Sequence, residues 1–165
     1  NPAYKTISGG VTEQNRVDMI KLAIAGFSYF RFSDMELNRE GTTYTVDTLR
    51  ALTKENTDCR YYFIMGADSL YQIETWKDPD QIFAMADILV ATRNDSRSAL
   101  DAQIDYLEEK YGGKIYHLSS PSIEISSNDI RKRCKNGSSI HFFLPENVID
   151  YIERNDLYGI TADRR

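Results

Sequence analysis

Two junctions in the sequence place polar residues directly after an apolar run. Gly66 and Asp68 follow the apolar run 61–65, and Arg93 follows the apolar run 87–91. A glycine at such a point lets a ligand approach the backbone, a carboxylate accepts hydrogen bonds from a ribose or a base, and an arginine binds phosphate. The same residues have ordinary structural uses, since Gly66 can serve a turn, Asp68 can cap a helix and Arg93 can be a solvated loop residue.

A third junction precedes a helical segment and combines a hydroxyl group with a guanidinium group. It reads Ile-Ser-Ser-Asn-Asp-Ile-Arg over residues 125–131, so that Ser127 and Arg131 are four residues apart. Residues at this spacing project from one side of a helix, and the amide groups at a helix start bind anions. The group therefore suits a polyphosphate, with a serine cap and a surface arginine as the structural alternative.

Trp76 has the chemistry to stack on a planar ring, and the segment 43–45 has the chemistry to hold a carboxylate. Trp76 is the only tryptophan and lies in a polar stretch, so its ring can stack on a ligand or fill the core. Thr43, Tyr44 and Thr45 precede an amphipathic segment, where amides and hydroxyls can hold a carboxylate. Capping of that helix by Thr45 would satisfy the same backbone groups and is the structural alternative.

Several familiar catalytic and metal-binding patterns do not occur in the sequence. It contains neither Gly-x-x-x-x-Gly-Lys-Ser/Thr nor Gly-x-Gly-x-x-Gly, and His117 and His141 stand outside the three junctions. Cys59 and Cys134 form no Cys-x-x-Cys motif and have no histidine at ligand spacing, which disfavours both zinc and a disulfide framework. No residue is therefore assigned as a metal ligand, and a reducing, cytoplasmic location is expected.

Composition narrows the class of protein further. The chain has 165 residues, a net charge of −5 and a sequence pI of about 5.1, which disfavours a non-specific nucleic-acid binder. Its apolar runs are far shorter than the ~20 residues that a membrane helix needs. With 41% hydrophobic and 27% charged residues, it is expected to form one globular domain.

The elements that must position these residues follow from the periodicity of apolar side chains. Helices are predicted over about 13–25, 45–54, 98–111, 128–135 and 146–154. Strands are predicted over 29–33, continuing toward Leu37, and over 60–65, 87–91 and 114–118. In the first helix Val17, Ile20 and Ile24 are expected to share one face. Alternating strands and helices, with strands that are apolar throughout, predict a doubly wound α/β domain whose parallel sheet is covered on both faces.

Taken together and in order, the motifs resemble bacterial nicotinate-nucleotide adenylyltransferase, an enzyme family of NAD biosynthesis. The resemblance rests on Asn1 to Lys5, Arg39 with Thr-Tyr-Thr-x-Asp-Thr-Leu at 43–49, Phe-Ile-x-Gly-x-Asp-Ser-Leu at 63–70, Trp76, Arg93, the 125–131 segment and the terminal Leu157-Tyr158. It extends from about residue 1 to 158. Each motif alone is weak, but their order and spacing are specific.

The resemblance implies a Rossmann-like fold of the nucleotidyltransferase type and the reaction of nicotinate mononucleotide with ATP to give deamido-NAD and pyrophosphate. On the acceptor side, it implies that Thr43, Tyr44 and Thr45 hold the nicotinate carboxylate, that Trp76 stacks on the pyridine ring and that Lys5 lies near the mononucleotide phosphate. The nucleotide-binding residues that it implies are Gly66, Asp68, Arg93, Ile125, Ser127 and Arg131. Mg²⁺ is expected to accompany ATP.

The sequence also departs from the family pattern. Tyr4 stands where the family usually has a histidine, and Asn128 where it commonly has a threonine. The family's Gly-x-Phe-x-Pro-x-His-x-Gly-His loop, whose histidines stabilise the charge on the transferred phosphoryl group, is not among the 165 residues. We therefore expect no catalytic residue in this chain, an N-terminal truncation, no activity of the chain alone, and an exposed apolar sheet edge beside 61–65.

Three alternatives stay open at this point. A related adenylyltransferase could use another acceptor, such as phosphopantetheine, although the 43–45 segment and Trp76 argue against it. A nucleotide-binding module without catalysis and a purely structural α/β protein are the others. The sequence also leaves open a homo-oligomer and the choice between nicotinate and nicotinamide mononucleotide.

Overall fold

The computed structural model describes residues 10–92, 97–119 and 125–160. The predictions for Lys5 and Arg93 therefore lie outside the described residues. The chain divides into two compact units, one formed mainly by residues 35–124 and the other by residues 4–34 together with 125–165. The prediction of a single domain stays a prediction.

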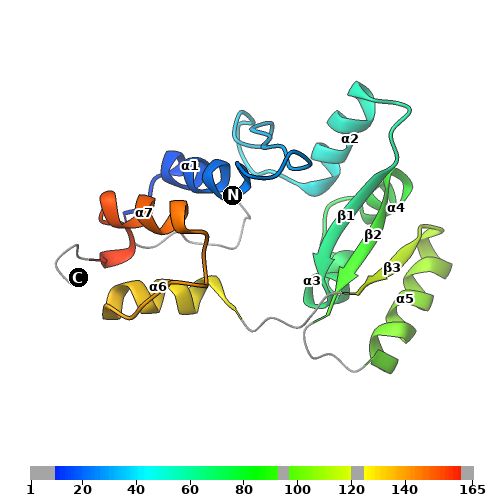
Figure 1. Cartoon of the computed structure of the whole chain (residues 1–165). Coiled ribbons are helices and arrows are strands. Elements are labelled where there is room, and N and C mark those ends of the chain that lie inside the picture. The colour runs from blue at the N-terminus through cyan, green and yellow to red at the C-terminus, as the bar shows by residue number, and fades with distance from the viewer. Residues whose placement is uncertain (1–9, 93–96, 120–124, 161–165) are drawn as a thin grey trace. The chain divides into compact units, whose positions relative to one another are not determined.

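The first unit contains a parallel sheet. Its described strands are β1 (Tyr61–Gly66), β2 (Ala86–Ala91) and β3 (Ile115–Leu118), and they lie in the order β1-β2-β3 (Figure 1). Phe63 is opposite Ile88 in the β1–β2 pairing, and Ile88 is opposite Ile115 in the β2–β3 pairing. The parallel pairing confirms the sheet type that the apolar runs predict. Parallel neighbours need a crossover connection, which helices commonly supply.

Helices connect these strands and cover the sheet. They are α2 (Thr45–Glu55), α3 (Ala67–Tyr71), the 3₁₀ turn η1 (Ile73–Thr75), α4 (Pro79–Met85) and α5 (Arg97–Tyr111). Their apolar side chains join those of the sheet in one core, which includes the fully buried Leu70, Ile82, Ile88, Leu100 and Leu107. α5 ends where Gly112 adopts a left-handed backbone (φ 70°), a common conformation just after a helix end.

The prediction that the strands are buried on both faces is wrong for β1. Phe63 and Met65 pack in or against the core, whereas the alternate residues Tyr62 and Ile64 are 49% and 61% exposed. Successive side chains of a strand point to opposite faces, so the packing partners of this unit cover one face of β1. A run of apolar residues does not by itself tell how many faces will be covered.

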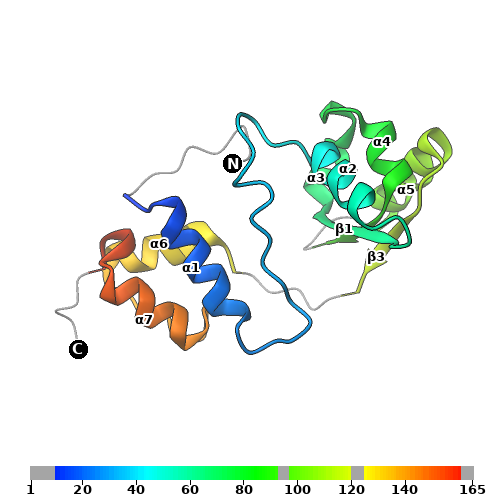
Figure 2. The same ribbon diagram turned by 90° about the horizontal axis from the view of Figure 1, so that it is seen from above.

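The second unit is helical. Its elements are α1 (Glu13–Ile24), α6 (Ser127–Asn136), α7 (Glu146–Arg154) and the 3₁₀ turn η2 (Leu157–Gly159), and α1 lies beside α7 (Figure 2). Thr12 caps α1 in a reciprocal capping box with Asn15. Tyr151 joins α7 to α1, since its hydroxyl accepts a hydrogen bond from Asn15 (3.2 Å) and donates one to Asp18 (2.8 Å).

One further prediction fails in the second unit. Residues 29–33 form no strand, and the rings of Phe27, Tyr29 and Phe30 contact one another with centroids 4.8–5.9 Å apart while remaining exposed. An aromatic run becomes a strand only where a neighbouring strand takes its backbone hydrogen bonds. On α1, Val17 is buried, whereas Ile20, expected on the same face, is 48% exposed. Among the described residues, no helix is long and apolar enough to cross a membrane.

Candidate functional site

The start of α2 carries no side-chain cap. Tyr44 occupies the cap position with an extended backbone, and its carbonyl accepts hydrogen bonds from the amides of Asp47 (3.0 Å) and Thr48 (3.3 Å). Thr45 is the first helical residue, so the alternative in which Thr45 caps the helix is wrong. The first amide groups of a helix have no partner within the helix, and this start of α2 suits an external anion.

Trp76 ends the 3₁₀ turn η1 and lies against the core of the same unit. Its amide donates to the carbonyl of Ile73 (3.0 Å), and its ring meets the ring of Phe63 edge-on, with centroids 6.1 Å apart. The side chain is partly buried. Part of the indole ring therefore packs against the core, as one of the two alternatives predicts, and the rest is accessible to a ligand.

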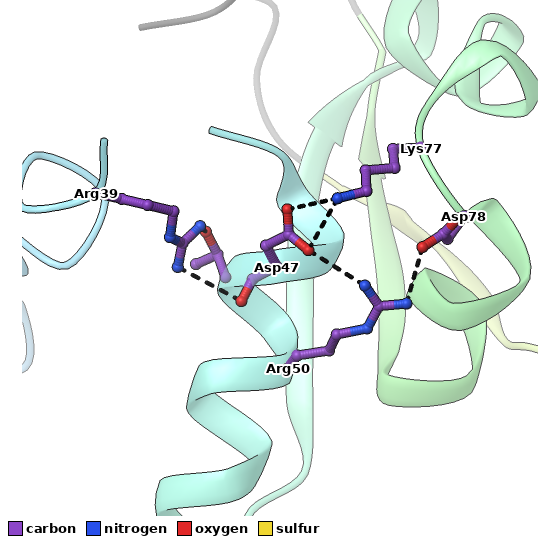
Figure 3. A network of polar contacts seen from close by, with 6 residues as sticks. Arg39, Asp47, Arg50, Lys77 and Asp78 are labelled. Carbon is purple, nitrogen blue, oxygen red and sulfur yellow. Dashed lines mark hydrogen bonds and ion pairs between the residues drawn. The ribbon is translucent and has the colours of Figure 1, made fainter. Parts of the chain in front are cut away.

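A chain of charged groups joins the start of α2 to the residues that follow Trp76 (Figure 3). The Lys77 ammonium group lies 3.0 Å and 3.3 Å from the two carboxylate oxygens of Asp47 and 4.8 Å from the centroid of the Tyr44 ring. Arg50 donates to Asp47 (3.2 Å) and to Asp78 (2.8 Å). We call Asp47, Lys77, Arg50 and Asp78 the α2 clamp, because these residues hold the two segments together.

The charges of the α2 clamp stabilise one another. The hydrogen bond from Lys77 lowers the pKa of Asp47, against an opposing effect of burial, and Arg50 lowers it further. The hydrogen bond with Asp78 raises the pKa of Arg50. These pairings favour the ionised forms of Asp47 and Arg50.

A second group of polar contacts holds the turn before Trp76 to α5. One carboxylate oxygen of Glu74 accepts hydrogen bonds from Lys110 (2.6 Å), Tyr111 (3.1 Å) and Tyr106 (3.2 Å). The hydrogen bond from Lys110 lowers the pKa of Glu74, and Glu74 in turn raises that of Lys110. The residues on the two sides of Trp76 are thus held, Lys77 by the α2 clamp and Glu74 by α5.

The carboxyl ends of β1 and β2 lie side by side, as the sequence predicts. Gly66 is opposite Ala91 in the sheet, and a Cβ atom added at Gly66 would meet nothing within 4 Å. Gly66 itself occupies the cap position of α3, so the alternative that Asp68 caps this helix is wrong. Asp68 is exposed in the first turn of α3 and is accessible to a ligand above Gly66.

In the second unit, the serine cap of α6 is Ser126. Its hydroxyl accepts from the amide of Asp129 (3.1 Å) and donates to the Asp129 carboxylate (2.5 Å). Ser127 is therefore the first helical residue, and its side chain is exposed one turn before the exposed Arg131. Ile125 immediately precedes the cap. The hydroxyl of Ser127 and the guanidinium of Arg131 lie on one side of the helix start, as predicted.

Ser127 and Arg131 also line a cavity of about 350 Å³ within the second unit, whose other walls are mainly apolar side chains of α1 and α7. Tyr158 lines it too, in a left-handed backbone conformation (φ 59°). Burial raises the pKa of Tyr158, and the positive charge of Arg131 opposes this shift.

The predicted site residues thus fall into two groups. Thr43, Tyr44, Thr45, Gly66, Asp68 and Trp76 belong to the first unit, whereas Ile125, Ser127 and Arg131 belong to the second. Their convergence on one pair of substrates stays a prediction. Sequence reasoning missed Arg50, Lys77 and Asp78. The charged stretch around Trp76 was a signal for Lys77 and Asp78, whereas Arg50 in the helix predicted over 45–54 had none.

The parallel sheet and the residues at its carboxyl edge define a class of protein. Residues 1–133 match the model of the cytidylyltransferase-like family, so the chain is a nucleotidyltransferase of the cytidylyltransferase-like type. A protein of Lachnoclostridium phytofermentans named "Probable nicotinate-nucleotide adenylyltransferase" is 46% identical over 158 residues, which are 95% of this chain and 79% of that protein. A protein of the same name from Clostridium botulinum (strain Eklund 17B / Type B) is 40% identical over 159 residues, which are 96% of this chain and 78% of that protein. The chain belongs to the nicotinate-nucleotide adenylyltransferase family.

Solved structures agree with this fold. The nicotinic acid mononucleotide adenylyltransferase of Plasmodium falciparum, complexed with NaAD, superposes with a TM-score of 0.73 at 19% sequence identity. The match covers 98% of this chain and 80% of the solved chain. The prediction of a Rossmann-like nucleotidyltransferase fold is confirmed.

Proposed function

We propose that the protein binds ATP and nicotinate mononucleotide and serves adenylyl transfer between them, giving deamido-NAD and pyrophosphate. One observation carries the acceptor assignment: the uncapped start of α2 is joined through Lys77 to the segment that bears Trp76. An anion-binding helix start beside an accessible indole ring matches a pyridine ring with a carboxylate substituent. The names of its relatives point to the same acceptor.

In the proposed reaction, a phosphate oxygen of the mononucleotide attacks the α-phosphorus of ATP. A new P–O–P bond forms, the bond from the α-phosphorus to the bridging oxygen breaks, and pyrophosphate leaves with that electron pair. The chain's own residues would contribute by positioning, since such transfers depend on alignment and charge stabilisation. Thr43, Tyr44 and Thr45 would hold the carboxylate.

The ATP side of the proposal rests on donors that suit a triphosphate. Gly66 and Asp68 would meet the ribose or the adenine, and Ser127 and Arg131 would meet phosphate oxygens. The hydroxyl and the guanidinium would bind phosphate oxygens and not the metal. Mg²⁺ would therefore be held mainly by the phosphates of ATP, as is usual for this ion. Lys5 and Arg93 stay predicted phosphate contacts, and Ile125 a predicted neighbour of the nucleotide.

Binding of nicotinate mononucleotide to the chain tests the acceptor assignment directly. We expect saturable quenching of Trp76 fluorescence, because Trp76 is the only tryptophan. By calorimetry, W76A should weaken this binding about tenfold or more, as loss of an aromatic stacking partner does, while W76F should retain most of it. K114M, which alters an ion pair with Glu108, is the matched control. Equal affinity of W76A and wild type would contradict the role of Trp76.

Turnover tests the expectation about the histidine loop. With Mg²⁺, ATP and nicotinate mononucleotide, the 165-residue chain should bind both nucleotides and form no deamido-NAD. Formation of deamido-NAD would show that these residues suffice for catalysis. Binding of neither nucleotide would overturn the proposed function. Binding of phosphopantetheine, but not of the mononucleotide, would favour the other acceptor class.

The cellular setting belongs to the same proposal. Both cysteines are free, Cys59 exposed and Cys134 buried, which fits the proposed cytoplasmic location. Sedimentation analysis would decide whether the protein forms a homo-oligomer, which stays a prediction.

A further inference from the structure

The carboxylate of Asp47 lies close to the place where the substrate carboxylate is proposed to bind. Asp47 is the third residue of α2, and a carboxylate at this position commonly reaches back to the amide of the cap residue or is attracted by the positive helix start. In either arrangement it would compete with an external anion for the same groups. The first turn of α2 therefore contains a potential internal competitor of the substrate.

The α2 clamp holds that competitor elsewhere. Both oxygens of Asp47 face the Lys77 ammonium group, at 3.0 Å and 3.3 Å, and one of them also accepts from Arg50 at 3.2 Å (Figure 3). Arg50 is held in turn by Asp78, 2.8 Å away. Lys77 also lies over the ring of Tyr44, the cap residue, so its position is defined on two sides.

We infer that Lys77 is a specificity-determining residue, which keeps the Asp47 carboxylate paired and displaced so that the start of α2 is open to an anionic acceptor. This inference rests on the proposed function and adds to it a reason for choosing nicotinate over nicotinamide mononucleotide. The two acceptors differ at the ring substituent, a carboxylate in one and a neutral amide in the other. A negative charge left unpaired at Asp47 opposes the first and has little effect on the second.

The expected effect follows from the exposure of the pair. The side chains of Lys77 and Asp47 are 42% and 28% exposed, so solvent screens their charges in part. We expect K77M to weaken nicotinate mononucleotide binding about fivefold, the scale of one partly exposed charge interaction. Nicotinamide mononucleotide binding should change less than twofold. The difference should shrink as salt is raised to 1 M, where the screening length is about 3 Å.

A second substitution separates this role from a merely structural one. In K77M/D47N the competing charge is gone, so binding of nicotinate mononucleotide should recover to within about twofold of the wild type. If the pair acted only by tying two segments together, the double variant would bind as weakly as K77M or more weakly. Because Lys77 is exposed, K77M should fold, which the far-ultraviolet circular dichroism spectrum and the urea midpoint would confirm.

The experiment is a calorimetric titration of wild type, K77M, D47N, K77M/D47N and the K114M control with each mononucleotide. Selective loss in K77M with recovery in K77M/D47N is the expected result. Normal binding by K77M, equal loss for both mononucleotides, or no recovery in the double variant would overturn the role of Lys77 while leaving the proposed function standing. Failure of the wild type to bind nicotinate mononucleotide would overturn both.

Discussion

A methyl group added at Gly113 should destabilise the first unit, because Phe83 already occupies the space. A Cβ atom at Gly113 would lie 2.7 Å from Cδ1, 3.0 Å from Cβ and 3.2 Å from Cγ of Phe83. Phe83 has little freedom to move, since it is 5% exposed and its ring stacks on Tyr111 with centroids 4.9 Å apart. The added methyl must therefore displace packed core atoms.

Overpacking of this kind costs about 1–3 kcal/mol, so we expect the free energy of unfolding of G113A to fall by that amount. Urea unfolding should show a lower midpoint with an unchanged slope, because the native fold and the surface exposed on unfolding stay the same. In G113A/F83L, the more flexible leucine should recover part of the loss.

Gly66 offers the matched control, because the same methyl group there would meet nothing within 4 Å on an extended backbone. G66A should keep the unfolding free energy within about 1 kcal/mol of wild type. By narrowing the approach to the backbone it should weaken ATP binding, which calorimetry would measure. Equal urea midpoints for G113A and G66A would refute the packing argument.

The other predictions concern the core of the second unit, the stability of the fold at low pH and the reactivity of the two thiols. Ile149 is 1% exposed, so I149A should lower the unfolding free energy by about 2–5 kcal/mol, and a loss below 1 kcal/mol in urea would contradict its place in the core. Lys77 lowers the pKa of Asp47 from its ordinary value of 3.8, so their pairing stabilises the fold above that pH and is lost as the pH falls through the lowered pKa. The stability difference between wild type and D47N should accordingly shrink below about pH 4, and a difference that grows there would contradict the pairing. A thiol reagent should modify Cys59 in the native protein and Cys134 only after denaturation, because Cys134 is buried and burial raises its pKa. Rapid modification of both thiols in the native protein would contradict the burial of Cys134.

The segment that carries Trp76 is held by partners from distant parts of the chain. Glu74 is held by three residues of α5, and Lys77 is held by Asp47 at the start of α2. A ring that stacks on a ligand loses less conformational freedom on binding when it is already oriented. Both groups of contacts are therefore expected to favour binding of the acceptor ring.

Local signals in the sequence were enough to place most of the elements. The helix predicted over 146–154 is α7 with the same ends, and the runs 60–65 and 87–91 differ from β1 and β2 by a single residue at one or both ends. Thr12, a residue type that is favoured at helix starts, caps α1. Periodicity, caps and glycine stops act over a few residues, so they are readable without knowledge of the fold.

The site was predictable in kind but not in detail. The types of residue at 43–45, Trp76 and 125–131, with the family resemblance, were sufficient to propose a mononucleotide and ATP. The alternatives that involved capping could be decided only in three dimensions, where Tyr44, Gly66 and Ser126 occupy the cap positions. A cap depends on the backbone conformation of one residue, which residue type alone does not determine.

What the sequence by itself determined is therefore the order and type of most elements, the parallel sheet and the family. Only the tertiary structure decided that Tyr62 and Ile64 stay exposed, that residues 29–33 form no strand, and that Asp47 pairs with Lys77. The physical reason is common to all three. Coverage of a face, pairing of a strand and pairing of charges each require a partner from elsewhere in the chain, and Asp47 meets Lys77 only because the fold brings together residues 30 positions apart.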